Sequence, residues 1–256
     1  MFFDLTFLPL VERLAPLAKG VRHWVLMTDK AHMPESSGVE PMCYEDLVNS
    51  HSDQYEWPEI DENAASSLCY TSGTTGNPKG VLYSHRSTIL HAYAACLPDA
   101  LNLSARDVVL PVVPMFHVNA WGLPYSGPLV GAKLVFPGAQ LDGASLHELF
   151  LNEGVTVSAG VPTIWLGLLA HVKGNKLDFG PLQRTIIGGS ACPPAMIRSF
   201  EDDFGVQVLH AWGMTEMSPL GTVNTFKNRQ LALSKDERDA IQNKHCLLYT
   251  SDAADE

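Results

Sequence analysis

The alternation of short apolar runs with segments of helical spacing constrains the fold more than any other feature of this sequence. It continues from Ala64 to Gly213, and several runs end in glycine or proline. Repetition of strand, helix and strand predicts an α/β fold of layered, mostly parallel sheets with helices on both faces. In such sheets, ligands bind beyond the carboxyl ends of the strands.

The boundaries of the expected elements follow from hydrophobic spacing and from Gly, Pro, Ser and Asp punctuation. We expect strands at 66–71, 80–85, 107–115, 132–138, 155–162, 182–190 and 206–213. We expect helices at 86–101, 118–131, 142–154, 163–172 and 193–205. Earlier in the chain, a strand at 23–29 and a short helix at 44–50 precede an acidic, polar linker over 51–63.

Composition narrows the class of protein. The chain has 256 residues, of which 46% are hydrophobic and 18% charged, which is typical of a soluble globular protein with one sizeable core. A net charge of −11 argues against nucleic acid and against anionic membranes as partners. The apolar stretch 108–138 carries five prolines and Lys133, so we interpret it as buried strands and a helix and not as a membrane span.

The five cysteines are scattered, without a CxxC pair or a Cys/His spacing typical of zinc. This pattern indicates free buried thiols in a reducing compartment, and we expect a cytoplasmic location. The cysteines are Cys43, Cys69, Cys96, Cys192 and Cys246.

The last eleven residues, "CLLYTSDAADE", differ in style from the preceding chain. Their back-translation resembles a transposase adapter used in preparing sequencing libraries. We therefore expect 246–256 to be a non-native tail and exclude it from the fold. Without its three acids, Asp252, Asp255 and Glu256, the net charge changes from −11 to −8.

The stretch "TSGTTGNPKG", from Thr71 to Gly80, has the composition of a phosphate-binding loop. Its glycines allow a run of backbone amides to face an anion, its hydroxyls add donors, and Lys79 adds a positive charge. These residues are Thr71, Ser72, Gly73, Thr74, Thr75, Gly76, Lys79 and Gly80. A Walker A loop would continue into a helix, whereas here a strand pattern, "GVLYSH", follows. The alternative is a polar hairpin turn.

Four motifs in order resemble those of the AMP-forming acyl-CoA synthetases, within the adenylate-forming superfamily. "YTSGTTGNPKGVLYSHR" resembles the phosphate loop, and "PMFHVNAWG" (114–122) resembles the acyl-pocket segment. "GGSACPP" (188–194) resembles the adenine loop, and "HAWGMTE" (210–216) resembles the aromatic-Gly-x-Thr-Glu segment. The resemblance covers nearly all of residues 1–227 and is greatest to medium- and long-chain fatty acyl-CoA ligases.

The resemblance implies ATP-dependent activation of a carboxylic acid, a fatty acid in the first instance, to acyl-AMP and then acyl-CoA, with Mg²⁺ as cofactor and CoA as co-substrate. It implies that residues 71–76 and Lys79 hold the β- and γ-phosphates and that Thr215 donates to the α-phosphate. Glu216 would bind Mg²⁺, with Thr71 as a second candidate ligand.

The other two motifs are assigned to the base and to the acyl group. By resemblance, the adenine is held by Gly188, Gly189, Ser190, Ala191, Trp212 and Gly213, with Trp212 standing where the family commonly has Tyr. His117 would position the substrate carboxylate, because a carboxylate needs no general base at pH 7. Five neighbours of His117 have two interpretations: they line an acyl tunnel, or they simply pack in the core. They are Met115, Phe116, Val118, Trp121 and Gly122.

These implications divide the chain into a partial N-terminal segment and linker (1–63), an incomplete nucleotide- and acyl-binding core (64–245) and the tail. Family members continue into a ribose-binding Asp and a small C-terminal domain. We therefore expect a chain truncated at both ends, with little or no ligase activity alone.

Three alternatives stay open at this point. They are adenylation without CoA transfer, as in luciferases or carrier-loading enzymes, a P-loop NTPase or kinase, and a non-catalytic nucleotide-binding module. Expected partners are small molecules and no nucleic acid, with at most peripheral membrane association. A homodimer is left open.

Overall fold

The computed structural model describes residues 1–71 and 77–243. The chain forms two compact units, Met1–Glu59 and Ile60–Glu256. The first contains a parallel sheet in the order β1 (Phe2–Phe3), β2 (Val25–Leu26) and β3 (Met42–Cys43), with helices α1 (Leu8–Leu14) and α2 (Tyr44–Asn49). Phe3, Val11, Leu26 and Val39 form its small core. The expected strand and helix in this unit are both present, and the strand is shorter than expected.

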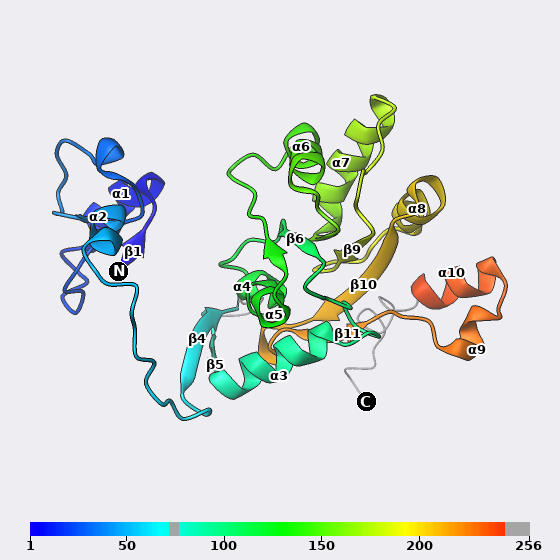
Figure 1. Cartoon of the computed structure of the whole chain (residues 1–256), viewed down its shortest axis with the longest axis horizontal. Coiled ribbons are helices and arrows are strands. Elements are labelled where there is room, and N and C mark those ends of the chain that lie inside the picture. The colour runs from blue at the N-terminus through cyan, green and yellow to red at the C-terminus, as the bar shows by residue number, and fades with distance from the viewer. Residues whose placement is uncertain (72–76, 244–256) are drawn as a thin grey trace. The chain divides into compact units, whose positions relative to one another are not determined.

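A six-stranded sheet with the order β11-β10-β9-β8-β6-β7 forms the centre of the second unit (Figure 1). All its pairs are parallel except β10 with β11, so the predicted mostly parallel α/β fold is confirmed. The strands are β6 (Val108–Pro111), β7 (Lys133–Leu134), β8 (Val157–Gly160), β9 (Arg184–Ile187), β10 (Gln207–Gly213) and β11 (Leu220–Val223).

Helices cover both faces of this sheet, as predicted. Successive residues of a strand point to opposite faces, so each strand packs against helices on both sides. Leu110, Ile187 and Val208 pack with one group of helices, and their chain neighbours Val109, Ile186 and Leu209 pack with the other. The first group is α6 (Gly143–Glu153), α7 (Pro162–Gly174) and α8 (Pro194–Arg198). The second is α3 (His85–Cys96) and α5 (Leu123–Val130), which Figure 1 shows on the side opposite α6 and α7.

Local chemistry explains where several helices begin and end. The Asp142 carboxylate accepts hydrogen bonds from the amides of Ala144 (3.0 Å) and Ser145 (3.1 Å), and Gly154 ends α6 with a φ of +70°. Helix α3 ends earlier than expected because Leu97, which precedes Pro98, takes an extended conformation.

The prediction of a single helix over 118–131 is wrong. Val118–Trp121 (α4) forms a left-handed turn with φ values between +46° and +57°, and a right-handed helix, α5, starts only after Gly122. The helix expected at 193–205 is also divided, into α8 and a π-helical turn at Ser199–Asp203. Strand β11 and the helices α9 (Asn228–Leu231) and α10 (Lys235–Asn243) were not anticipated.

The first two strands of the core region stand apart from the parallel sheet. β4 (Ala65–Tyr70) and β5 (Gly80–Ser84) form an antiparallel pair in which Cys69 lies opposite Val81. The expectation that the Gly/Thr-rich loop lies between two strands is therefore confirmed. One face of this hairpin is buried, where Cys69 and Tyr83 pack with Val118.

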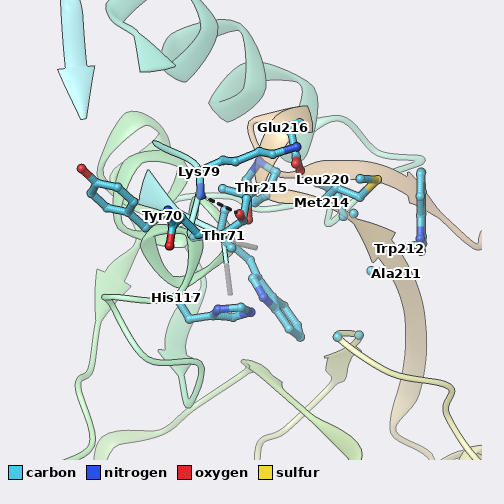
Figure 2. A pocket seen from close by; sticks show the side chains of 17 residues that line it. Tyr70, Thr71, Lys79, His117, Ala211, Trp212, Met214, Thr215, Glu216 and Leu220 are labelled. Atoms are coloured by element: carbon cyan, nitrogen blue, oxygen red, sulfur yellow. Dashed lines mark hydrogen bonds between the residues drawn. The ribbon is translucent and has the colours of Figure 1, made fainter. Parts of the chain in front are cut away.

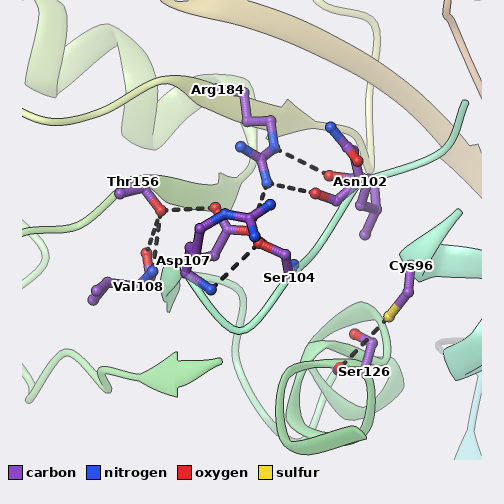
Figure 3. A network of polar contacts seen from close by, with 10 residues as sticks. Cys96, Asn102, Ser104, Asp107, Val108, Ser126, Thr156 and Arg184 are labelled. Atoms are coloured by element: carbon purple, nitrogen blue, oxygen red, sulfur yellow. Dashed lines mark hydrogen bonds and ion pairs between the residues drawn. The ribbon is translucent and has the colours of Figure 1, made fainter. Parts of the chain in front are cut away.

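A buried ion pair joins the amino ends of three strands (Figure 3). Arg184, at the start of β9, donates to the Asp107 carboxylate just before β6 (2.9 Å) and to the carbonyls of Leu101 (3.1 Å) and Asn102 (2.8 Å). The hydroxyl of Thr156, before β8, donates to the same carboxylate (3.0 Å). This network fixes the strands at the end of the sheet remote from the loops that follow them.

The strand order places a topological switch point at β6, because β7 lies on one side of it and β8 on the other. Ligands in open α/β sheets bind at the carboxyl end of such a point. Among the helices that the structure describes, none has the length and apolar character needed to cross a bilayer.

Candidate active site

A cavity of about 380 Å³ opens at the carboxyl ends of β6, β9 and β10, beside the end of the β4–β5 hairpin (Figure 2). Four separate segments of the second unit contribute to its wall, and each contains one of the four motifs. The lining residues are Tyr70, Thr71, Asn77, Lys79, His117, Val118, Trp121, Gly188, Gly189, Ala211, Trp212, Gly213, Met214, Thr215, Glu216, Pro219 and Leu220.

The neck of the Gly/Thr-rich loop is closed by two hydrogen bonds. The Thr71 amide donates to the Lys79 carbonyl (2.9 Å), and the Lys79 amide donates to the Thr71 hydroxyl (3.3 Å). Five of the expected phosphate-binding residues, Ser72, Gly73, Thr74, Thr75 and Gly76, lie outside the described residues. Figure 2 shows the Lys79 side chain extending toward the segment with Thr215 and Glu216.

Thr215 and Glu216 lie in a short 3-10 turn (Thr215–Met217) directly after β10. The chain then returns as β11, and the Met214 amide donates to the Pro219 carbonyl (2.9 Å) at the base of this turn. The turn brings Thr215 and Glu216 to the cavity that Thr71 and Lys79 also line. Among the described lining residues, Glu216 is the only carboxylate and Lys79 the only lysine or arginine.

The structure brings only some of the expected adenine-binding residues to the cavity. Gly188 and Gly189 line the cavity after β9, as do Trp212 and Gly213 at the end of β10. Ser190 and Ala191 are exposed and do not belong to the lining. A Cβ atom at Gly188 would lie 2.8 Å from the Ala211 carbonyl oxygen and 3.3 Å from the Trp121 ring, so the strand end and the indole meet there.

The acyl-pocket segment is also divided. His117, Val118 and Trp121 line the cavity, because the left-handed turn after β6 folds them back over the strand ends. Met115 and Phe116 are exposed by 51% and 91% and lie off this wall, as does the buried Gly122. The side-chain amide nitrogen (Nδ2) of Asn119 donates to the Ser67 hydroxyl (3.0 Å), which ties the turn to the hairpin.

The donor set fits a magnesium ion shared with a phosphate ligand and does not fit a metal cage made by protein alone. Within residues 1–71 and 77–243, no group of three or more His, Cys, Asp or Glu is placed to hold a metal. Mg²⁺ commonly takes one or two carboxylates and completes its shell with water and substrate phosphates. The Glu216 carboxylate and the Thr71 hydroxyl both line the cavity, and this donor set matches that requirement.

Comparison with protein families agrees with this geometry. The family described as "AMP-binding enzyme" matches residues 9–241. The chain belongs to the AMP-binding enzyme family.

Two relatives of this AMP-binding chain show how close the similarity is. It is 56% identical over 242 residues to a medium-chain-fatty-acid–CoA ligase of Ectopseudomonas oleovorans. This match covers 94% of this chain and 44% of the relative. It is 51% identical over 251 residues to a 3-methylmercaptopropionyl-CoA ligase of Ruegeria lacuscaerulensis. This match covers 96% of this chain and 45% of the relative. The chain thus spans less than half the length of the curated relatives it matches.

A solved structure shares the fold. A long-chain-fatty-acid-CoA ligase from Archaeoglobus fulgidus superimposes with a TM-score of 0.73 at 22% identity, over 87% of this chain and 44% of the solved chain. At that identity the likeness concerns the fold alone.

Several residues that line the cavity were not anticipated. Tyr70, Asn77, Ala211 and Met214 lie within the quoted motifs but were given no role, so membership of a motif was a usable signal. Pro219 and Leu220 lie at the start of β11, whose run "LGTV" has too few apolar residues to stand out as a strand.

Proposed function

We propose that this AMP-binding chain carries the ATP-binding and acid-activating site of an AMP-forming acid–thiol ligase. The single observation that supports the proposal is the convergence of Lys79, Thr215 and Glu216 on one cavity with Gly188 and His117. The two relatives named above are CoA ligases for a medium-chain fatty acid and for 3-methylmercaptopropionate. An apolar carboxylic acid is accordingly the proposed substrate class, and its chain length is left to experiment.

The proposed first step is attack of a carboxylate oxygen on the α-phosphorus of ATP, with pyrophosphate as the leaving group. Negative charge on the phosphate oxygens must be stabilised, so catalysis depends mainly on placement and electrostatics. Lys79 would neutralise part of the negative charge on the β- and γ-phosphates, and the amides of residues 72–76 would donate to the same phosphates. The Thr215 hydroxyl would donate to the α-phosphate.

Glu216, with Thr71, would hold Mg²⁺ against the phosphates. When bound, the ion supplies charge neutralisation for the phosphate oxygens.

His117 is proposed to orient the acid. Its exposed ring lies on the cavity wall at the switch point after β6, where a carboxylate would approach the phosphates. A carboxylate is already ionised at pH 7, so His117 has no proton to remove and acts by position. Val118 and Trp121 supply the neighbouring apolar wall.

The second step, thiol attack of CoA on the acyl-AMP with release of AMP, is proposed for the whole protein. The relatives are more than twice as long as this chain, and adenylation without CoA transfer is the alternative that their names disfavour. We also propose a cytoplasmic location, because the cysteines are scattered through the sequence without a CxxC pair, with at most peripheral membrane contact and with a homodimer open.

The test uses a chimera in which this chain replaces the matching 44% of the Ectopseudomonas relative. With Mg²⁺, ATP, CoA and a panel of acids from methylthiopropionate to long-chain fatty acids, we expect acid-dependent release of AMP and pyrophosphate. The same chimera with Glu216→Gln is the control and should release little AMP. Release of ADP, or of no nucleotide product by a folded chimera, would contradict the proposal.

A further inference from the structure

The turn that carries Thr215 and Glu216 is held from behind at both ends. The Tyr83 hydroxyl on β5 donates to the Thr215 carbonyl, and the Leu220 amide donates to Nε2 of His91 on α3 (3.1 Å). Neither side chain lines the cavity itself. We propose that Tyr83 and His91 are positioning residues, which fix the Thr215–Leu220 segment and thereby place the Thr215 hydroxyl and the Glu216 carboxylate in the cavity that Lys79 also lines. This inference rests on the proposed function.

Tyr83 couples the turn to the phosphate loop. It lies on β5, four residues after Lys79, and its side chain is only 5% exposed, packed with Cys69 and Val118. Burial raises the pKa of Tyr83 far above its usual range, with smaller contributions from Cys69 and Glu216, so the hydroxyl keeps the proton that it donates. One hydroxyl thus connects the strand that leaves the loop with the residue before Glu216.

His91 couples the same turn to the acyl-pocket segment. A Cβ atom at Gly122 would lie 2.6 Å from its Cε1 and 2.7 Å from its Nδ1, so the ring sits tightly between Gly122 and Leu220. Since Nε2 accepts the Leu220 amide proton, the imidazole must be neutral with its proton on Nδ1. Burial lowers the pKa of His91, which favours this neutral form.

The two contacts act directly behind the cavity wall. Val118 and Pro219 line the main cavity on one side and a second, smaller cavity on the other. The smaller cavity is lined by Tyr83, Thr88, His91, Val118, Asn119, Gly122, Tyr125, Ser218 and Pro219. Among these described residues, the titratable groups that line the smaller cavity with His91 are Tyr83 from β5 and Tyr125 from α5.

Protonation of His91 should therefore release the turn. A protonated ring has a donor at Nε2, which would face the Leu220 amide donor. Because the folded-state pKa is lowered, the contact is complete above the ordinary histidine value of about 6.5 and is lost as the pH falls through the lower folded value.

The experiment compares Mg·ATP and adenosine binding to the purified chain by calorimetry. Tyr83→Phe removes only the hydroxyl, His91→Leu removes the acceptor, and His91→Gln keeps an acceptor that does not titrate. Tyr125→Phe is the matched control, a phenol of the same small cavity with no hydrogen bond to the turn. We expect about tenfold weaker Mg·ATP binding for Tyr83→Phe and His91→Leu, no change for Tyr125→Phe, and near-normal binding for His91→Gln.

Adenosine and pH separate positioning from general damage. Adenosine lacks phosphates, so its affinity should stay the same in the variants, whereas a collapsed cavity would lose both ligands. Mg·ATP affinity should fall on acidification from pH 7.5 to about 5.5 more steeply in the wild type than in His91→Gln. Equal Mg·ATP affinity for Tyr83→Phe, Tyr125→Phe and the wild type, with the same acid profile for His91→Gln, would overturn the inference.

Hydrogen exchange of the Leu220 amide distinguishes this inference from the proposed function. Protection should fall in His91→Leu without any ligand, and that result stands even if the wild type binds no ATP, in which case only the proposed function fails. If the wild type binds Mg·ATP but Leu220 exchanges equally in both proteins, only the positioning role fails. If His91→Leu does not fold, the pH dependence of Mg·ATP affinity in His91→Gln, compared with that of the wild type, still tests the role of His91.

Discussion

At Gly213 the backbone has no room for a side chain. A Cβ atom there would lie 2.1 Å from the Pro219 carbonyl oxygen and 2.9 Å from its carbon, and both obstacles are backbone atoms that cannot rotate away. The glycine of the aromatic-Gly-x-Thr-Glu motif therefore serves first to let β11 return beside β10. Its place on the cavity wall follows from that close approach.

We predict that Gly213→Ala lowers the free energy of unfolding by about 3 kcal/mol, the upper end of ordinary overpacking costs. The matched control is Gly167→Ala in α7, where a Cβ atom would meet nothing within 4 Å. Replacing a helical glycine by alanine should raise stability by about 0.5–1 kcal/mol. Urea unfolding measures both, and a Gly213→Ala protein as stable as the wild type would contradict the steric account.

The sequence singled out several residues that line the cavity, but it did not single out the two side chains that contact the Thr215–Leu220 segment from behind. Lys79, Thr215 and Glu216 stand in stretches with unusual composition, so their convergence could be anticipated. Tyr83 and His91 resemble ordinary strand and helix residues, and we assigned His91 no role from the sequence. Their contacts with Thr215 and Leu220 span 132 and 129 residues of chain, a separation that no local pattern displays.

The elements that the sequence predicted best are those whose burial is continuous. β8 and β9 are buried along their full length and were anticipated because apolar runs bounded by glycine or proline indicate such strands. The turn at Val118–Trp121 was missed because its positive φ values depend on tertiary contacts, including that of Asn119 with Ser67. Left-handed backbone costs free energy for residues other than glycine, so only surrounding structure can impose it.

The ends of the strands opposite the cavity depend on the Arg184–Asp107 pair. We predict that Arg184→Met lowers the free energy of unfolding by about 3–5 kcal/mol, because it leaves a buried carboxylate without its counter-ion. A charge-matched control is Lys133→Met, which breaks the exposed pair of Lys133 with Glu153 and should cost less than about 1 kcal/mol. Similar losses for the two variants in urea unfolding would show that the buried network has no special importance.

The same pair gives a pH dependence with a defined sign. Burial acts to raise the pKa of Asp107, but the Ser104 amide, the Arg184 charge and the Thr156 hydroxyl outweigh it, and the pKa is lowered overall. A lowered carboxyl pKa stabilises the fold above the unfolded value of about 3.9, and this contribution is lost as the pH falls through the folded value. Stability measured from pH 6 down to about 3 should therefore decline less steeply in Asp107→Asn than in the wild type.

At the scale of the whole molecule, the residues that line the cavity are concentrated in one part of the chain. Every described residue of the cavity wall lies between Tyr70 and Leu220, within the second compact unit. The wall is assembled from loops that follow β6, β9 and β10 and from the β4–β5 hairpin, and the buried network holds the same sheet at its other end. A rigid sheet with variable loops at one edge is the arrangement expected of an α/β ligand site.

The central claim is that Lys79 and Glu216 act on the same bound triphosphate, the first on its charge and the second through Mg²⁺. Calorimetric titration of ATP with and without Mg²⁺ tests this most directly, in the wild type, Lys79→Met and Glu216→Gln. We predict that Lys79→Met weakens ATP binding at least about tenfold in both conditions, as for loss of a charged hydrogen bond, and that Glu216→Gln removes only the gain due to Mg²⁺. A Glu216→Gln chain that keeps the full Mg²⁺ gain, or a folded wild type that binds no ATP, would contradict the claim.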